Sequence, residues 1–201
     1  ELAQSLFLDM FGDPVTNPKG WEVRPIGEMI DKVAKWNPRK EGGETSFQYI
    51  DLGSVDKDSK RILTEEITLV RAFEAPSRAR QLARSNDILV STVRPNLNGV
   101  AMVPEGFDSV TASTGFCVLR PMNHSWANFL FNWVQTDFFI DEMVKQSTGA
   151  NYPAVSEKTI RASKVFTPPL QLLERFNAEG AIIKSLKNAA RSQNDLENKL
   201  F

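Results

Sequence analysis

The sequence is poor in the residues that build reactive and metal-binding sites. It holds one cysteine and one histidine in 201 residues. A single cysteine rules out an internal disulfide framework and fits a reducing cytoplasm, where we expect the chain to reside. Cys117 lies in the apolar phrase GFCVLR without a basic neighbour or a histidine to activate it, so we expect a buried structural thiol. The lone histidine, His124, excludes a histidine-based metal cluster.

Long apolar runs and an excess of charge are also missing. No apolar run approaches the ~20 residues that a membrane-spanning helix needs, so membrane insertion is not expected. The formal net charge of −1 argues against a protein that coats nucleic acid indiscriminately. At this length the chain has room for one ordinary domain with an appendage, or for two very small domains.

Motifs that carry catalysis are absent from the sequence as well. There is no glycine-rich phosphate loop, and no Gly-x-Gly-x-x-Gly follows a strand. A Ser-His-Asp arrangement would need His124 as its base, and nothing around it suggests that role. The phrase TPPL at 167–170 resembles a tetrapeptide of amino-methyltransferases, but it lacks both the amide and the aromatic ring. We therefore expect no catalytic residue, no cofactor and no metal, with an undetected enzyme as the alternative.

The middle of the chain is built from short segments rich in β-branched and aromatic residues, bounded by Gly, Pro, Asn or Asp. These predict strands in 47–56, 61–66, 86–93, 99–103 and 109–120, after a short strand and helical turn in 21–30. The apolar period then changes, and 125–146 is predicted to be one helix whose aromatic residues belong to the core. A loop, a short helix from about Ser156 and a strand ended by Pro168 follow. The expected fold class is α/β, of mixed α+β character, with a mixed and partly antiparallel sheet.

The last thirty residues have a different pattern. From Leu170 onward there is no proline, and one stripe of residues steps 4-3-4-3-4 along the chain. The stripe consists of Ile182, Leu186, Ala189, Gln193, Leu196 and Leu200. Such spacing is typical of a coiled-coil seam. Because an isolated helix of this composition is only marginally stable in water, the seam is expected to meet another helix.

The two ends of the chain resemble each other. ELAQSLF opens the sequence and DLENKLF closes it, with leucine and phenylalanine repeated at one constant offset. Coincidence between leucine-rich helices is one interpretation. The other is one period of a longer helix–domain–helix–domain architecture, with 1–13 as the end of a preceding helix, a domain in 14–169 and a long helix in 170–201. Two copies would then pair as a homodimer through their terminal helices.

Positive charge gathers in one stretch. Residues 71–102 hold five arginines and two carboxylates, a net charge of +3. Candidate DNA-binding residues in this stretch are Arg78, Arg80, Arg84, Arg94, Asn96 and Asn98, and a second loop adds Lys145, Asn151 and Tyr152. Arginine forks match guanine or phosphate oxygens, and asparagine pairs with adenine, so both loops suit the reading of base edges. A solvated charged face and asparagines that merely form turns are the alternatives.

Four phrases in this order resemble the specificity subunit of bacterial type I restriction-modification systems. They are SLFLDMFGDP at 5–14, GWEVRPIGE at 20–28, NDILVSTVRPNLNGVAMVPE at 86–105 and STGANYPAVSEKTIRASKVFTPPLQLLERF at 147–176. Asn86 stands where the family usually has glycine, and Glu174-Arg175 stands where it usually has Glu-Gln. The resemblance covers essentially the whole chain and indicates a half-length form.

The resemblance implies a target-recognition domain in 14–169 and a spacer helix in 170–201. By the same comparison the protein would read one half of a split site in double-stranded DNA. It would scaffold DNA adenine methyltransferase (modification) subunits and a restriction subunit, which perform the chemistry. Within such a site we expect Arg78, Arg80, Arg94, Asn96, Asn98, Asn151 and Tyr152 to read bases, and Lys145 and Arg84 to position phosphates. The alternative is a half-length mimic that binds modification subunits and regulates or blocks restriction without strong DNA binding.

Overall fold

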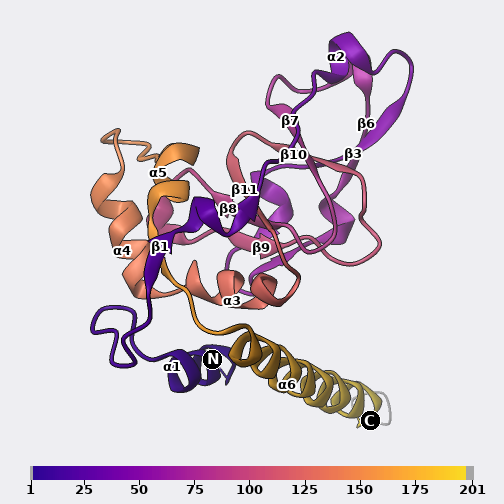
Figure 1. The fold of residues 1–201 in the computed structure, drawn as a ribbon. Helices are drawn as coiled ribbons and strands as arrows, with labels where there is room; N and C mark the ends of the chain where they lie inside the picture. Colours follow the sequence, from indigo (N-terminus) through magenta and orange to yellow (C-terminus); the bar gives the residue numbers. More distant parts are fainter. Residues whose placement is uncertain (1, 198–201) are drawn as a thin grey trace.

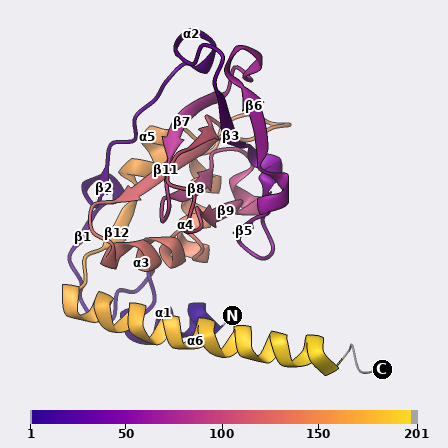
Figure 2. The same cartoon turned by 90° about the vertical axis from the view of Figure 1, so that its right-hand side faces the viewer.

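The computed structural model describes residues 2–197. A head of small sheets and short helices sits on one long helix, which runs along its base and past it (Figures 1 and 2). The helices are α1 (Leu2–Phe11), α2 (Pro38–Glu41), α3 (Ser125–Trp133), α4 (Asp137–Gln146), α5 (Glu157–Ala162) and α6 (Leu170–Glu197), with short 3₁₀ turns η1 (Ile26–Glu28), η2 (Leu52–Ser54), η3 (Thr64–Glu66), η4 (Ala72–Glu74) and η5 (Pro95–Leu97). The strands are β1 (Val23–Pro25), β2 (Ile30–Asp31), β3 (Ser46–Ile50), β4 (Val55–Asp56), β5 (Arg61–Ile62), β6 (Thr68–Arg71), β7 (Ala79–Ala83), β8 (Ile88–Ser91), β9 (Val100–Met102), β10 (Val110–Ser113), β11 (Phe116–Pro121) and β12 (Lys164–Phe166).

Two four-stranded sheets form the head, in the orders β6-β3-β10-β7 and β2-β11-β8-β9. β3 and β10 are parallel, and the other pairs in these sheets are antiparallel, which confirms the mixed, partly antiparallel character. The single strand predicted for 109–120 is wrong, because β10 and β11 belong to different sheets. The chain changes sheets at Gly115, where an added Cβ would lie 3.0 Å from Leu52 Cδ1.

The helix predicted for 125–146 is also interrupted. α3 ends at Trp133 and α4 begins at Asp137, with Thr136 as the N-cap of α4. The Thr136 hydroxyl donates to the carbonyl of Trp133 (2.7 Å) and accepts from the amide of Phe139 (3.3 Å). One side chain thus ends one helix and starts the next, because a threonine oxygen replaces the missing helical partner.

Both ends of the domain meet beside the long helix. β1 pairs antiparallel with β12, so α1 and α6 emerge next to each other and run in opposite directions (Figure 2). An aromatic cluster fills the contact and consists of Phe7, Phe11, Phe129, Trp133 and Phe176. The Phe11 ring lies 4.7 Å from Phe129 and 5.2 Å from Phe176, both edge-on. Phe129 and Trp133, two of the aromatic residues of 125–146 predicted to be core, are therefore packed against α1 and α6.

The long helix predicted from Leu170 onward is confirmed. Its first turns are anchored, because Leu173 and Phe176 are buried against the head. Farther along, Ile182 is 61% exposed and Leu186 64% exposed. With 28 residues the helix is about 42 Å long, and its C-terminal end passes the edge of the head (Figure 2). None of the described helices has the length and apolar composition that crossing a membrane requires.

Cys117 is a buried free thiol, as the sequence predicts. It lies in β11, between the sheet and the main core. Burial disfavours the thiolate and raises the pKa of Cys117 to about 12, while the charge of Arg161 opposes the shift only partly. Because the thiolate is the reactive form, the side chain acts as a small apolar core residue.

Replacing Phe11 by alanine tests whether α1 is an integral part of the head. We expect the free energy of unfolding to fall by about 3–5 kcal/mol, because a fully buried ring leaves a cavity between three elements. Leu8→Ala in the same helix is the matched control, since Leu8 is 44% exposed, and should change stability by less than about 0.5 kcal/mol. Urea denaturation measures both, and equal losses in the two variants would contradict this packing.

Candidate nucleic-acid interface

Four loops that are distant in sequence are joined by backbone hydrogen bonds. The amide of Thr114 donates to the carbonyl of Arg78 (2.9 Å), and the amide of Thr92 donates to the carbonyl of Gly115 (2.9 Å). The Thr92 hydroxyl donates to the same Gly115 oxygen at 2.9 Å. The end of β8, the turn between β10 and β11 and the start of β7 therefore lie side by side.

The loop before α5 extends this connection. The amide of Val155 donates to the carbonyl of Thr92 (2.8 Å), and the amide of Arg94 donates to the carbonyl of Pro153 (2.7 Å). Thr148 and Ala154 exchange two backbone hydrogen bonds of 2.9 Å, which close the loop into a small hairpin. We call the resulting surface the rim, and it comprises residues 78, 92–98, 114–115 and 148–155.

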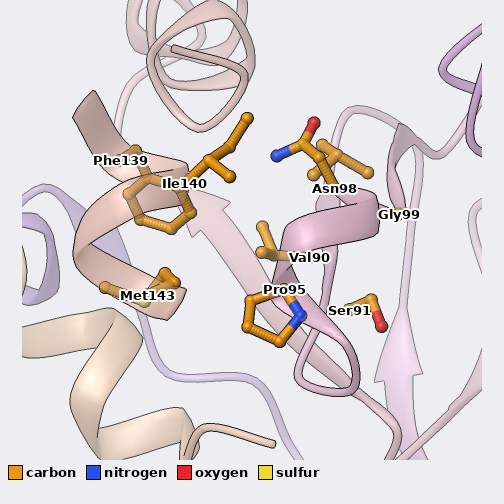
Figure 3. Close-up of a pocket in the computed structure, with 9 residues that line it drawn as sticks. Val90, Ser91, Pro95, Asn98, Gly99, Phe139, Ile140 and Met143 are labelled. Atoms are coloured by element: carbon orange, nitrogen blue, oxygen red, sulfur yellow. The ribbon is translucent and has the colours of Figure 1, made fainter. Parts of the chain in front are cut away.

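The segment 94–98 has a strained but fixed backbone. Arg94 and Asn98 both adopt the left-handed conformation, with φ of 47° and 44°, and they flank the turn η5. Underneath, Pro95 and Val90 face Phe139 and Met143 of α4 across a cavity of only about 10 Å³ (Figure 3). This space is at the lower limit for a single water molecule, so the loop rests directly on α4.

Asn98 is a structural residue of this loop. It is 8% exposed, and its side-chain amide donates to the carbonyl of Val134 (2.8 Å). The ammonium group of Lys60 donates to both the backbone carbonyl (2.6 Å) and Oδ1 (2.7 Å) of Asn98. The structure thus argues against our expectation that Asn98 reads a base, because its amide nitrogen and oxygen are already used inside the protein.

Lys60 is a contributor that the sequence did not reveal. It lies in the turn between β4 and β5, and its contact with Asn98 joins that turn to the rim. Burial lowers the pKa of Lys60, and the charges of Asp58 and Asp56 oppose that shift. Lys60 ends the polar sequence KDSK, which is typical of an exposed turn. Nothing in that sequence indicates a contact with Asn98, 38 residues away.

Arg94 and Tyr152 are brought together by the rim. The guanidinium carbon of Arg94 lies 5.0 Å from the centroid of the Tyr152 ring. Both residues are exposed, and Tyr152 as a whole is 52% exposed. The prediction that the two loops contribute to one surface agrees with this geometry, whereas their contact with DNA stays a prediction.

The remaining predicted residues are divided between the rim and other places. Asn96, Asn151 and Arg78 lie on the rim and are exposed. Lys145 is exposed in the last turn of α4, just before the hairpin. Arg80 is half-buried in β7, and its guanidinium donates to the carbonyl of the preceding residue (3.0 Å).

Arg84 lies away from the rim, at the opposite end of β8. It lines a hollow of about 370 Å³ together with Arg120 and His124. Below it, the carboxylate of Asp87 accepts two hydrogen bonds from the Arg120 guanidinium (2.9 and 2.7 Å) and one from the Arg84 amide (2.9 Å). Asp87 is 1% exposed, so this ion pair is a buried anchor of the turn that holds Arg84.

Two of the six predicted seam residues have described side chains. Ile182 and Leu186 are exposed in the middle of α6. Ala189, Gln193, Leu196 and Leu200 lie outside the residues whose side chains the structure describes. Pairing of the seam with another helix therefore stays a prediction.

Comparison with known proteins places this geometry in a family context. A sequence model of the type I restriction modification DNA specificity domain matches residues 18–200. The crystal structure of the HsdS subunit from Thermoanaerobacter tengcongensis is similar, with 30% sequence identity and a TM-score of 0.72 over 89% of this chain and 46% of that chain. A chain from a structural study of complex assembly and conformational transition of the type I R-M system is also 30% identical, with a TM-score of 0.73 over 90% of this chain and 47% of its own. This chain thus spans less than half the length of either structure, and no curated relative matches it.

Lys60→Met tests the support of segment 94–98. The substitution keeps an apolar stem but leaves the two Asn98 oxygens without their donor, so we expect a loss of about 1–3 kcal/mol in the free energy of unfolding. Lys57→Met in the same turn is the control, because Lys57 is exposed and should matter by less than about 0.5 kcal/mol. Denaturant titration measures both variants. Equal midpoints would show that Lys60 does not support the loop.

Proposed function

Because the chain belongs to the family of type I restriction modification DNA specificity domains, we propose that it reads one half of a split site in double-stranded DNA through the rim. The observation that carries the proposal is the rim itself, in which fixed backbone presents exposed arginine and asparagine side chains together. Arg94, Asn96 and Asn151 are the proposed base readers. Arg78 and Lys145 flank them and would contact phosphates as well as or instead of bases.

The low net charge of the chain supports sequence reading through the fit of side chains to base edges. The whole chain has a net charge of −1, so general attraction to phosphate is weak. The residues of the rim include two arginines, Arg78 and Arg94, and no carboxylate, and Lys145 lies just before its hairpin. A protein of this kind selects DNA by how well a few side chains fit base edges, because the pattern of donors and acceptors on those edges distinguishes the four base pairs in the major groove.

We further propose a division of labour with separate enzymes. In this proposal 14–169 is the recognition domain, 170–201 is the spacer helix, and 1–13 belongs to a helix equivalent to that spacer. The helical base would carry DNA adenine methyltransferase subunits and a restriction subunit, while this chain catalyses no reaction in the cytoplasm. One similar solved chain comes from a study of complex assembly in the type I R-M system, which supports an assembling role.

The exposed part of α6 supports pairing between two copies. Ile182 and Leu186 place two large apolar side chains in water at heptad spacing, and apolar stripes of this width are stable when another helix covers them. Two antiparallel α6 helices would hold two rims apart and let the dimer read both halves of a split site.

A second function uses the same helix without the rim. A half-length chain that occupies modification subunits would regulate or block restriction. The exposed seam favours this alternative as much as it favours pairing, because either partner would cover Ile182 and Leu186. The salt dependence of DNA binding separates the two functions.

The first experiment measures that dependence, with a duplex selected from a randomised pool by the wild-type protein. We expect affinity to fall steeply between low and physiological salt, since each neutralised phosphate releases counterions. Arg94→Ala should weaken the selected duplex by about 1–3 kcal/mol and relax the preference at one base pair. Arg24→Ala is the control, because Arg24 lies in β1 and pairs with Glu22. A flat salt response together with binding to a methyltransferase subunit would favour the regulatory function.

The second experiment tests the seam by sedimentation velocity at micromolar concentration. We expect a wild-type dimer, and a monomer for Leu186→Glu, because a buried unpaired carboxylate would be placed in the apolar contact. Ser185→Glu is the matched control, since Ser185 is exposed beside the stripe and should leave the dimer intact. A wild-type protein that is already monomeric would refute pairing through α6.

A further inference from the structure

The contact between Arg94 and Tyr152 has a specific orientation. The guanidinium group lies over the face of the ring, 5.0 Å from its centroid. A guanidinium that packs with its face against a ring leaves the N–H groups at its edge free to donate. Among residues 2–197 none of the ion pairs involves Arg94. The donors of this arginine are therefore directed to the surroundings of the protein.

The backbone fixes both partners of the stack. Arg94 is held in the left-handed region, with φ of 47°, and its amide is bound to Pro153, the residue after Tyr152. On the other side, the hairpin turns at Gly149, where φ is 99° and an added Cβ would lie 2.9 Å from the carbonyl oxygen of Tyr152. The two backbones are thus positioned by hydrogen bonds and by a glycine that the turn requires.

A free arginine side chain samples many rotamers and therefore presents its fork in many planes. An arginine stacked on a ring keeps its fork in one plane. Guanine offers two acceptors, O6 and N7, side by side in the major groove, and both are satisfied only when the fork lies in the plane of the base. A phosphate group has oxygens in several directions and imposes no such restriction. The stacked geometry is consequently matched to a base rather than to a phosphate.

We propose that Tyr152 is a positioning residue, which holds the Arg94 fork in the plane needed to select guanine at one position of the site. The proposal rests on the proposed function, because it needs DNA to be read at the rim. It also changes the role of Tyr152 from the one predicted by sequence, since the face of the ring that stacks on Arg94 is not available to a base.

The test begins with the base preference of the wild-type protein, obtained from a randomised duplex pool. Each selected position is then varied to all four base pairs, and the affinities of the wild type and five variants are compared. We expect a G·C preference at one position that Arg94→Ala abolishes. Tyr152→Ala should reduce the discrimination at that same position by about twofold to fivefold, the loss expected for one exposed cation–π contact. Tyr152→Phe should restore it, since the ring is kept.

Two controls separate positioning from a general effect. Phe73→Ala removes another exposed aromatic ring that lies 6.0 Å from an arginine, Arg71, and should leave the preference unchanged. The slope of affinity against salt should be the same for the wild type and Tyr152→Ala, because no phosphate contact is removed. Thermal melting of each variant confirms that the fold is retained.

Several results would overturn the proposal. The positioning role is refuted if Tyr152→Ala weakens every duplex equally. It is also refuted if Tyr152→Ala changes the base preference at a position that Arg94→Ala does not affect. In the double variant Arg94→Ala/Tyr152→Ala, a further loss beyond that of Arg94→Ala shows that Tyr152 contacts DNA itself. A wild-type protein that selects no sequence refutes the proposed function, and the positioning role with it.

A measurement without DNA tests the stack alone. The ring current of Tyr152 should move the NMR signal of the Arg94 δ-methylene protons upfield in the wild type and in Tyr152→Phe, and the shift should disappear in Tyr152→Ala. If the shift is absent from the wild type while the protein still selects DNA, the proposed function stands and the positioning role of Tyr152 is refuted.

Discussion

Backbone hydrogen bonds between four distant loops are the constraint on which the candidate site depends. Buried or crowded peptide groups need partners, and here the partners come from other loops instead of a regular sheet. Thr92 is central, because its amide and hydroxyl bind Gly115 and its carbonyl accepts from Val155. The main chain therefore determines where the rim lies. Side chains such as Asn96 and Asn151 project from it without supporting it, so substitutions there change what the rim offers to a ligand and leave its shape intact.

The aromatic cluster holds the long helix in place, as the backbone hydrogen bonds hold the rim. Phe7 and Phe11 of α1 contact Phe129 of α3 and Phe176 of α6, so one packing unit fixes the head on both helices. Edge-to-face pairs add about 0.5–1.5 kcal/mol each beyond the burial of their area, and their geometry is directional. A rigid connection of this kind is needed if a helix is to act as a spacer, because the distance between two reading surfaces is defined only when each head holds a fixed angle to its helix.

The sequence predicted the fold class and several elements well, for identifiable physical reasons. The helix after Pro169 and the short helix from Ser156 carry strong local signals, namely a proline-free amphipathic run and a serine N-cap. β7 was missed because one of the half-buried positions of ARQLA holds a long arginine, while its buried positions hold Ala79, Gln81 and Ala83, which have little strand preference. The break at Thr136 was missed because its capping hydroxyl matters only once α3 and α4 pack on different sides of the core.

Prediction of the site was limited because some of its contacts join residues that lie far apart in the sequence. Both basic loops were identified by their arginines and asparagines, and they do share one surface. The role of Asn98 follows the more ordinary interpretation, a turn-forming residue, because its side chain is held by Lys60 and Val134. Lys60 had no signal of its own. Which exposed residue reads a base depends on the DNA as well as on the protein. The protein sequence alone does not describe that DNA.

The strained backbone of segment 94–98 affects how tightly a protein with a net charge near zero can bind a ligand. Arg94 and Asn98 have left-handed backbone in segment 94–98, and Lys60, which braces that segment from the turn between β4 and β5, is left-handed as well, at a cost of roughly 1–2 kcal/mol per residue. The surrounding hydrogen bonds offset this cost when the protein folds, before any ligand arrives. Binding then loses little further conformational entropy, so that more of the contact energy remains as affinity for the ligand. Because the net charge of the chain is −1, general attraction to phosphate adds little affinity. The small loss of entropy therefore matters more than it would in a strongly basic protein. A flexible loop with the same arginines would lose that entropy on every sequence alike, which would weaken binding to matched and mismatched DNA by the same amount.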